Sequence, residues 1–275
     1  MTEVLRVDAT HPDDAAMARA AACLRRGGLV AFPTETVYGL GVHALDPDAV
    51  ARLFEAKQRP ADDPLIVHIG AFSAIDRLAV DIPDTARQLA ERFWPGPLTL
   101  VLKRSALVPD AVTAGLDTVA LRVPAHPVAR ALIAAAALPV AAPSANLFSR
   151  PSPTRAEHVL QDLAGRIDLI VDGGPTSVGI ESTVLDLSRG RAVILRPGAV
   201  TAAMLREILP VDESVPAAAS GPMPSPGLLA KHYSPRAPLT LYEGPDDRVR
   251  ARLLDDAGAQ LSAGRRVGLL LARGD

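Results

Sequence analysis

Two segments of the sequence carry most of the structural information. They are Gly28-Leu29-Val30-Ala31-Phe32-Pro33-Thr34-Glu35-Thr36-Val37-Tyr38-Gly39-Leu40-Gly41 and Lys57-Gln58-Arg59-Pro60-Ala61-Asp62-Asp63-Pro64-Leu65-Ile66-Val67-His68-Ile69. The apolar runs 29–32 and 65–69 are typical of buried strands, and the first is expected to end at Pro33, which has no N–H for a sheet ladder. Hydroxyls, a carboxylate and a phenol follow the first run, and a Lys-x-Arg pair precedes the second. Open α/β sheets build their binding sites at such strand ends.

The remaining chain alternates apolar runs with helical patterns, which predicts an α/β fold. Further strands are expected at 98–103, 119–123, 140–142, 169–171, 182–187 and 193–195. Helices are expected at 15–26, 47–57, 71–79, 83–93, 128–137, 154–163 and 201–209. Asp46, Thr154 and Thr201 are expected to cap three of these helices, since short polar side chains favour the N-cap position.

Composition excludes several classes of protein. The 275 residues are 48% hydrophobic and 22% charged, as in a soluble globular protein, and the net charge of −2 gives no general argument for nucleic-acid binding. Cys23 is the only cysteine, which excludes an intramolecular disulfide and a cysteine metal cluster, and the six histidines lack metal-ligand spacing. The N-terminus has no signal-peptide core, and the longest apolar run, 131–142, is too short to span a membrane. We therefore expect a cytoplasmic protein without membrane contact.

Composition also changes along the chain, which predicts three parts. Residues 1–209 form the expected main domain, and 210–238 are rich in proline, alanine, serine and glycine, as in a linker. Residues 239–275 have a β-α-β pattern, with strands expected at 239–242 and 267–271 and a helix at 246–261. A lone β-α-β unit leaves apolar faces uncovered, so we expect this last domain to be incomplete.

Common catalytic motifs do not account for the polar residues. The sequence has no Gly-x-x-x-x-Gly-Lys-Ser/Thr phosphate loop and no Gly-x-Ser-x-Gly nucleophile turn. Gly39-x-Gly41-x-x-Ala44 matches the dinucleotide fingerprint by letter, but the next helix is expected only after Asp46. Because that fingerprint requires a helix at the turn itself, a dinucleotide site is not favoured.

Several cations lie where strands are expected to end. Lys57 and Arg59 are typical of either a solvated helix end or an anion clamp, and His68 alone is typical of a core histidine. Arg122, inside an apolar strand, must meet a carboxylate or another anion. With Arg196 and the nearby hydroxyls, which could equally be turn residues, the pattern indicates a site for a nucleotide and a small carboxylate. Arg122 would meet the carboxylate, and the other three cations would meet phosphates.

Seven short sequence motifs containing these residues resemble those of a known protein family. The blocks, in chain order, are Pro33-Thr34-Glu35-Thr36-Val37-Tyr38-Gly39-Leu40, Lys57-x-Arg59-Pro60, Pro64-Leu65-Ile66-Val67-His68, Trp94-Pro95-Gly96-Pro97-Leu98-Thr99, Leu121-Arg122-Val123-Pro124, Pro143-Ser144-Ala145-Asn146 and Glu181-Ser182-Thr183. The chain resembles the threonylcarbamoyl-AMP synthase family over about residues 5–209. This implies a YrdC-like fold, a twisted mixed sheet flanked by helices with a large open cleft. Residues 225–235 resemble the linker of the long form, which continues into a Rossmann-like C-terminal domain.

The resemblance also implies a reaction. L-threonine, bicarbonate and ATP give threonylcarbamoyl-AMP, pyrophosphate and water, with Mg²⁺ carried by ATP rather than by protein side chains and with no prosthetic group. Residues implied for L-threonine are Thr34, His68, Arg122, Ala142 and Ser182. Residues implied for ATP are Arg59, Asp63, Thr118, Ser144, Ser152, Arg196 and Tyr233, the last as part of a lid. Lys57 and Arg59 are the expected catalytic residues, stabilising the phosphoryl transition state. The product would pass to a transferase that modifies tRNA.

Two alternatives remain open at this point. Related domains in hydrogenase-maturation carbamoyltransferases transfer a carbamoyl group through an adenylate, but within much larger chains. A binding module for double-stranded RNA or tRNA would instead use one basic face, formed by Lys57, Arg59, Arg150, Arg155 and Arg166. One residue departs from the family pattern: Asp63 stands where the family often has asparagine, and a carboxylate repels a triphosphate unless Mg²⁺ lies between them.

Overall fold

The computed structural model describes residues 1–213, 223, 225, 234–235 and 237–270. They belong to two units, Met1–Ser234 and Pro235–Asp275, which we describe separately. Most of the expected linker 210–238 lies outside the described residues, so the boundaries at 209 and 238 stay predictions.

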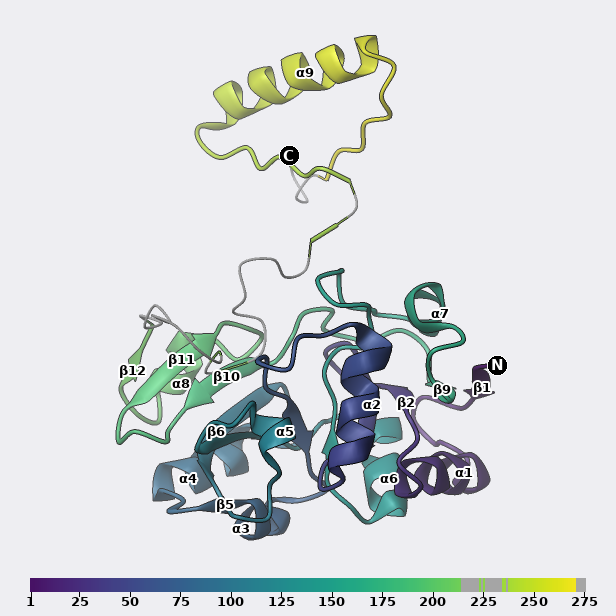
Figure 1. Ribbon diagram of the computed structural model, residues 1–275. Coiled ribbons are helices and arrows are strands. Elements are labelled where there is room, and N and C mark those ends of the chain that lie inside the picture. The colour runs from purple at the N-terminus through teal and green to yellow at the C-terminus, as the bar shows by residue number, and fades with distance from the viewer. Residues whose placement is uncertain (214–222, 224, 226–233, 236, 271–275) are drawn as a thin grey trace. The chain divides into compact units, whose positions relative to one another are not determined.

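The first unit is built on one mixed sheet, drawn in Figure 1. Its strands within the described residues are β1 (Glu3–Arg6), β2 (Val30–Pro33), β3 (Tyr38–His43), β4 (Ile66–His68), β5 (Ala79–Val80), β6 (Leu98–Arg104), β7 (Thr118–Arg122), β8 (Val140–Ala141), β9 (Leu169–Asp172), β10 (Thr183–Asp186), β11 (Ala192–Arg196) and β12 (Val211–Asp212). They pair in the order β1-β9-β2-β3-β8-β4-β7-β6-β10-β11-β12, with β5 beside β6. The pairs β4–β7 and β6–β10 are parallel, whereas β2–β3, β3–β8, β4–β8 and β6–β7 are antiparallel. This arrangement confirms the predicted mixed α/β sheet flanked by helices.

Helices cover the sheet of this unit. They are α1 (Asp14–Arg25), α2 (Pro47–Lys57), a 3₁₀ turn at Phe72–Ala74, α3 (Ile75–Leu78), α4 (Asp84–Phe93), α5 (Asp110–Thr113), α6 (Pro127–Ala136), α7 (Ala156–Leu163) and α8 (Ala202–Arg206). The start of α2 follows from sequence, since the Asp46 side chain accepts hydrogen bonds from the N–H groups of Asp48 and Ala49. Thr201 caps α8 as expected, whereas α7 has Arg155 at its N-cap and no side-chain cap bond. The expectation that Thr154 caps α7 was therefore wrong.

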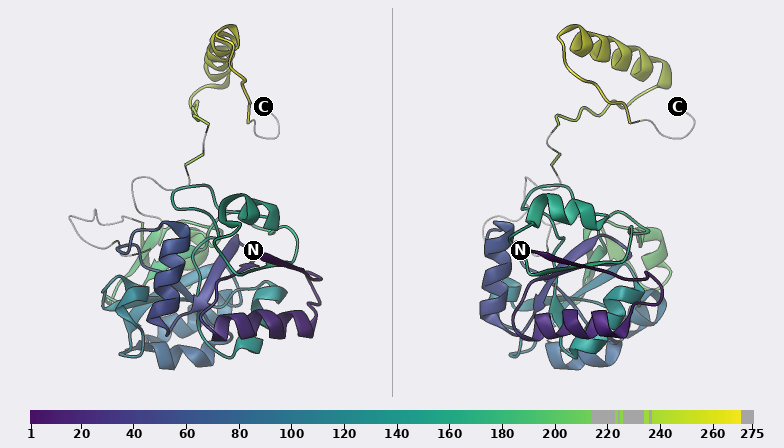
Figure 2. Two further views of the ribbon diagram at one scale, coloured as in Figure 1. Left: turned by 45° about the vertical axis from the view of Figure 1, so that its right-hand side comes forward. Right: turned by 90° about the vertical axis from the view of Figure 1, so that its right-hand side faces the viewer.

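Side chains of β2 alternate between two parts of the core. Val30 and Phe32 pack with α1 and α6, whereas Ala31, and Leu29 just before the strand, join the larger cluster that contains α2 and α4 residues. Figures 1 and 2 show α1 and α6 lying side by side against this part of the sheet. A strand buried on both faces explains why residues 29–32 read as a continuous apolar run rather than an alternating one.

The strand β3 was missed because its glycines hide the strand pattern. A Cβ atom at Gly41 would lie 2.7 Å from a ring carbon of Phe32 and 2.8 Å from a methyl carbon of Val140. Neighbouring strands therefore approach too closely at this position for any larger residue. The Gly39-x-Gly41 pair thus belongs to a strand antiparallel to β2 and not to a dinucleotide turn.

Cys23 lies in α1 with its side chain buried among the residues that α1 packs against β2. A Cβ atom at Gly28 would come within 2.4 Å of its sulfur, so the chain turns tightly over this thiol. Burial raises the pKa of Cys23 above its usual value, which lowers the fraction of reactive thiolate.

The second unit differs from the expected β-α-β pattern. Its helix α9 (Asp246–Ser262) is present, but residues 239–242 and 265–270 form no strand. Large apolar side chains such as Leu239, Leu254 and Leu270 are exposed, and α9 has no buried residue. Strands need neighbouring strands and a covering layer to bury their apolar faces, and the described residues of this unit supply neither.

Candidate active site

The site is a pocket at the ends of several strands of the first unit. Its lining residues are Thr34, Thr36, Val37, Gly39, Lys57, Arg59, Ile66, His68, Arg122, Ala142, Pro143, Ser144, Asn146, Phe148, Ser149, Glu181, Ser182 and Arg196. His68 and Arg122 are the last residues of the adjacent parallel strands β4 and β7 and pair directly in register. The predicted gathering of polar side chains at strand ends is therefore confirmed.

Arg122 is held from three sides. Its guanidinium donates from Nε to the carbonyl of Gly96 at 3.1 Å, from Nη1 to the hydroxyl of Thr36 at 3.1 Å and from Nη2 to a carboxylate oxygen of Glu35 at 2.5 Å. The second carboxylate oxygen of Glu35 accepts from the N–H of Ala125. Within the described residues, one N–H on each terminal nitrogen of Arg122 keeps no partner, and two such groups match the two oxygens of a ligand carboxylate.

Arg59 forms a second buried ion pair, with Asp63 at 2.9 Å. Arg59 also donates to the carbonyls of Asp63 and Pro64. Arg59 lines the pocket but Asp63 does not. Asp63 thus lies behind Arg59 and neutralises it, which gives its carboxylate a role that requires no metal ion between it and a phosphate.

Lys57, at the end of α2, is buried with 1% of its surface exposed. Its ammonium donates to the carbonyls of Ser144 and Asn146, both at 2.5 Å. Burial lowers the pKa of Lys57 well below its usual value, and the nearby guanidinium of Arg59 lowers it further. The two carbonyl contacts leave a third proton position on this nitrogen for a ligand.

Arg196 and Ser182 form a third group of polar side chains. Arg196 donates from Nε to the carbonyl of Ser182 at 3.1 Å and from Nη2 to its hydroxyl at 3.2 Å. The same hydroxyl lies 2.7 Å from that of Thr99. Gly198 allows this turn to close, because a Cβ atom there would lie 2.5 Å from the backbone nitrogen of Thr183.

His68 and Thr34 complete the wall beside Arg122. Burial lowers the pKa of His68 to about 3, helped by the charge of Arg122, so the imidazole is neutral at physiological pH. Its ring stands edge-on to Phe32 at 6.4 Å between centroids. The hydroxyl of Thr34 donates to the carbonyl of Val37 at 2.7 Å, which closes the turn between β2 and β3.

The structure brings together most of the residues that the sequence singled out. Those in the pocket lining are Thr34, Lys57, Arg59, His68, Arg122, Ala142, Ser144, Ser182 and Arg196. Ser152 lies outside the lining but donates a short hydrogen bond to Glu181, which is in it. Thr118 starts β7 and lies at the opposite end of that strand from Arg122, away from the lining. Tyr233 lies outside the described residues.

The expected basic face for RNA is not formed. Lys57 and Arg59 point into the buried pocket, and Arg150 is paired with Asp162 at 2.5 Å. Only Arg155 and Arg166 of the five proposed cations are exposed. The sequence could not show that two of these cations are buried and that a third is paired with Asp162.

Sequence reasoning assigned no role to Glu35, Asn146 and Glu181, although each lies within a quoted block. Glu35 holds Arg122, Asn146 donates to the carbonyls of Leu147 and Arg150, and Glu181 accepts from Ser152. A signal existed for Glu35: a buried arginine needs a counterion, and Glu35 was the one carboxylate in the quoted run 28–41.

The acidic groups of the site are already engaged by protein donors. Among the described residues, no group of three or more His, Cys, Asp or Glu side chains could hold a metal ion. The same part of the chain contains no helix with the length and hydropathy to cross a membrane.

Comparison with known proteins identifies the family to which the chain belongs. Residues 22–198 match the Sua5/YciO/YrdC family model described as "Telomere recombination", and residues 200–274 match the C-terminal domain model of threonylcarbamoyl-AMP synthase. The threonylcarbamoyl-AMP synthase of Pyrococcus abyssi is 48% identical over 91% of this chain and 75% of its own length, and that of Bacillus subtilis is 49% identical over 96% and 76%.

Solved structures agree with this match. The P. abyssi Sua5 structure complexed with L-threonine superposes with a TM-score of 0.90 at 44% identity, covering 98% of this chain and 82% of that one. Escherichia coli YciO shares the fold, with a TM-score of 0.67 at 24% identity over 74% of this chain and all of its own. From these matches and the pocket they accompany, the chain belongs to the threonylcarbamoyl-AMP synthase family.

Proposed function

We propose that the pocket binds L-threonine beside Arg122 and ATP beside Arg59, and that it joins them through bicarbonate-derived carbon. The activity of the family, and of this chain, is threonylcarbamoyl-AMP synthesis, which makes the protein a nucleotidyltransferase. The observation that carries the residue assignment is the geometry of Arg122, buried at a strand end with two N–H groups turned to no described partner.

The threonine side of the pocket is formed by Thr34, His68, Arg122, Ala142 and Ser182. Arg122 holds the substrate carboxylate by a bidentate pair, which is specific for planar anions. The imidazole of His68 is neutral, so it adds no second positive charge beside the threonine amine.

The nucleotide side is formed by Arg59, Ser144, Asn146, Ser149 and Arg196. Mg²⁺ enters here with the phosphates of ATP as part of the substrate, because the nearby carboxylates are already engaged by protein groups: Asp63 by Arg59, Glu35 by Arg122 and Glu181 by Ser152. Thr118, Ser152 and Tyr233 keep their assignment to ATP as predictions.

The reaction then needs no covalent enzyme intermediate. The threonine amine attacks the bicarbonate-derived carbon to form a carbamate, water leaves, and a carbamate oxygen attacks the α-phosphorus of ATP while pyrophosphate departs. Arg59 and Lys57 stabilise the charge that develops on the phosphoryl oxygens. Burial of Arg59 strengthens this effect, because the pocket screens charge less than water does. The product then passes to a transferase that modifies tRNA.

The test is pyrophosphate release from ATP with and without L-threonine and bicarbonate. We expect release to require both, and the product to have the mass of threonylcarbamoyl-AMP. Release without threonine would instead favour a carbamoyltransferase. For the threonine side, Arg122→Lys keeps the charge but loses the planar fork, so it should raise the threonine KM at least tenfold. Arg104→Lys, in the ion pair with Asp110 outside the pocket lining, is the matched control.

A further inference from the structure

A loop at residues 144–150 forms much of one pocket wall. Ser144, Asn146, Phe148 and Ser149 are all lining residues. We propose that Asp162 of α7, which does not line the pocket, is a positioning residue that fastens this loop and thereby sets the affinity for the nucleotide. The proposal rests on the proposed function in assigning the loop to ATP.

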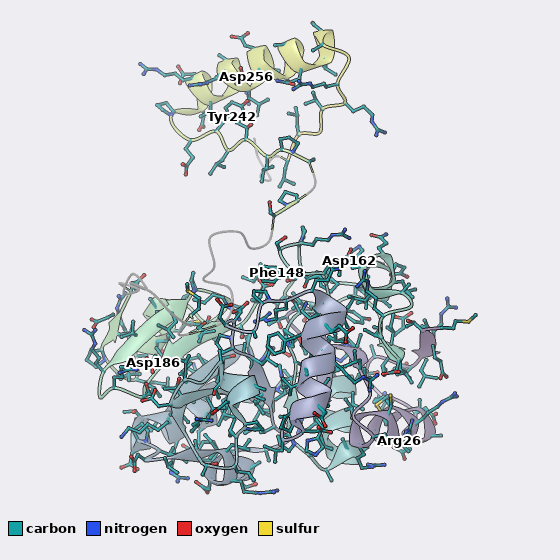
Figure 3. The ribbon with its side chains drawn as sticks, in the orientation of Figure 1. Arg26, Phe148, Asp162, Asp186, Tyr242 and Asp256 are labelled. Atoms are coloured by element: carbon teal, nitrogen blue, oxygen red, sulfur yellow. The ribbon has the colours of Figure 1, made fainter. Side chains whose placement is uncertain are left out.

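Asp162 contacts the loop with both oxygens. Its Oδ2 accepts a hydrogen bond from the N–H of Leu147 at 3.1 Å, and its Oδ1 accepts from Nη1 of Arg150 at 2.5 Å. The Asp162 side chain is 11% exposed, so these charge-assisted bonds form largely out of water, where they are strong. In Figure 3, Phe148 and Asp162 are labelled near the same end of α2.

The loop needs such a clamp because its conformation is strained. Ser149 has φ +68°, a left-handed conformation that costs energy for any residue with a Cβ atom. The strain falls within the segment that Asp162 closes at Leu147 and Arg150. From the pocket side, the N–H of Phe148 donates to the carbonyl of Lys57 at 2.9 Å, and the Asn146 side chain donates to the carbonyls of Leu147 and Arg150.

The loop is thus held by two sets of contacts. One set comes from residues that line the pocket, and the other comes from Asp162, which does not. Lys57 and Asn146 both line the pocket, so their substitution would also remove direct contacts with substrate. Asp162 reaches the loop from outside the lining. Substituting Asp162 therefore loosens the wall while leaving every lining side chain in place. Because the Asp162 charge also raises the pKa of Lys57, which burial lowers, kcat is measured beside the KM values.

The experiment compares Asp162→Asn with Glu157→Gln. Glu157 lies on the same helix, is exposed and has no hydrogen bond to the loop, so its variant controls for the loss of one negative charge from α7. Hydrogen exchange by mass spectrometry is measured on peptides covering 145–150, and the KM values for ATP and L-threonine are measured on the same samples. Arg150→Gln removes the same ion pair from the loop side and serves as a second variant.

We expect Asp162→Asn to speed exchange at 145–150 and to raise the ATP KM by about tenfold, with the threonine KM changed less than about twofold. Glu157→Gln should leave all three unchanged. Unchanged exchange in both Asp162→Asn and Arg150→Gln would overturn the clamp itself. Faster exchange with an unchanged ATP KM would keep the clamp but overturn the assignment of this loop to the nucleotide. An equal rise in both KM values would overturn the role in nucleotide affinity, because general loosening of the pocket produces that pattern.

Discussion

Two buried arginines of the pocket are each neutralised by a carboxylate, one from a nearby residue and one from a distant part of the chain. Arg59 pairs with Asp63 only four residues away, at 2.9 Å, and also meets two backbone carbonyls of the same short segment. Arg122 pairs with Glu35, 87 residues away, at 2.5 Å. The first pair is local and largely built by the turn after α2, whereas the second exists only when β7 and the turn between β2 and β3 have come together. The local pair should therefore tolerate change better than the long-range pair.

Breaking the long-range pair should have the largest effect. Glu35→Ala leaves the Arg122 charge buried without its carboxylate, which costs about 4 kcal/mol of unfolding free energy. The measurement is urea denaturation of Glu35→Ala beside Glu3→Ala, which removes the exposed ion pair between Glu3 and Arg19 and should cost about 0.5 kcal/mol or less. Equal losses in the two variants would show that burial of the pair does not matter.

His68 is a third buried basic group of the pocket, and it is kept neutral instead of being paired with a carboxylate. Its native pKa of about 3 lies below the value of 6.5 in the unfolded chain. Between these values the unfolded chain binds more protons, so the unfolding free energy falls as pH is lowered through this window. We expect a loss of about 3 kcal/mol from this group between pH 7 and pH 4.

That loss is measured from denaturation curves taken across the pH range. His68→Gln should flatten the profile by this amount, whereas His11→Gln, at an exposed side chain, should keep the wild-type slope. If the unfolding free energy of His68→Gln depended on pH as steeply as that of the wild type, the acid sensitivity would come from other groups.

Removing the cation of the local pair tests chemistry rather than stability. Arg59→Ala should lower kcat for pyrophosphate release by about a hundredfold, because it removes charge from the phosphoryl transition state. The threonine KM should change much less, since Arg122 holds that substrate. A rise in the threonine KM with an unchanged kcat would contradict the role of Arg59 in phosphoryl transfer.

The smallest effect is expected for the carboxylate of the local pair. Asp63→Asn removes the charge behind Arg59 but leaves the backbone carbonyls of residues 63 and 64 that also hold its guanidinium. We expect about 1 kcal/mol of lost stability and kcat within threefold of wild type. Denaturation and steady-state kinetics on Asp63→Asn beside Glu35→Gln test this directly, and a larger loss in Asp63→Asn would reverse the ranking of the two pairs.

Sequence alone predicted the parts of the site that depend on local pattern. The strands containing His68 and Arg122, the helix that ends at Lys57 and the turn at Ser144 were all placed correctly. Periodicity and caps reveal such elements because they are properties of neighbouring residues. The strand β3 was missed because Gly39 and Gly41 are required by the approach of neighbouring strands, which no local pattern reports.

Contacts between distant segments were the other limit. Glu35 and Arg122 lie in separate blocks of the sequence, and only the folded structure shows that they form an ion pair. The same limit applies to Asp162, which has no motif and gains its place from the loop that it contacts. In the second unit, residues 239–242 have a strand-like sequence pattern but form no strand. A strand needs a neighbouring strand to pair with, and a local pattern does not show whether one is present.

The buried thiol of Cys23 has a practical consequence for studying motion in this protein. It is the only cysteine in the chain, it lies buried under the tight turn at Gly28, and burial raises its pKa, which lowers the fraction of reactive thiolate. A cysteine engineered at an exposed position can therefore carry a single maleimide dye without first removing a native one. Fluorescence spectroscopy of the otherwise wild-type chain then becomes possible in the presence of substrates, with the label reporting from one defined site.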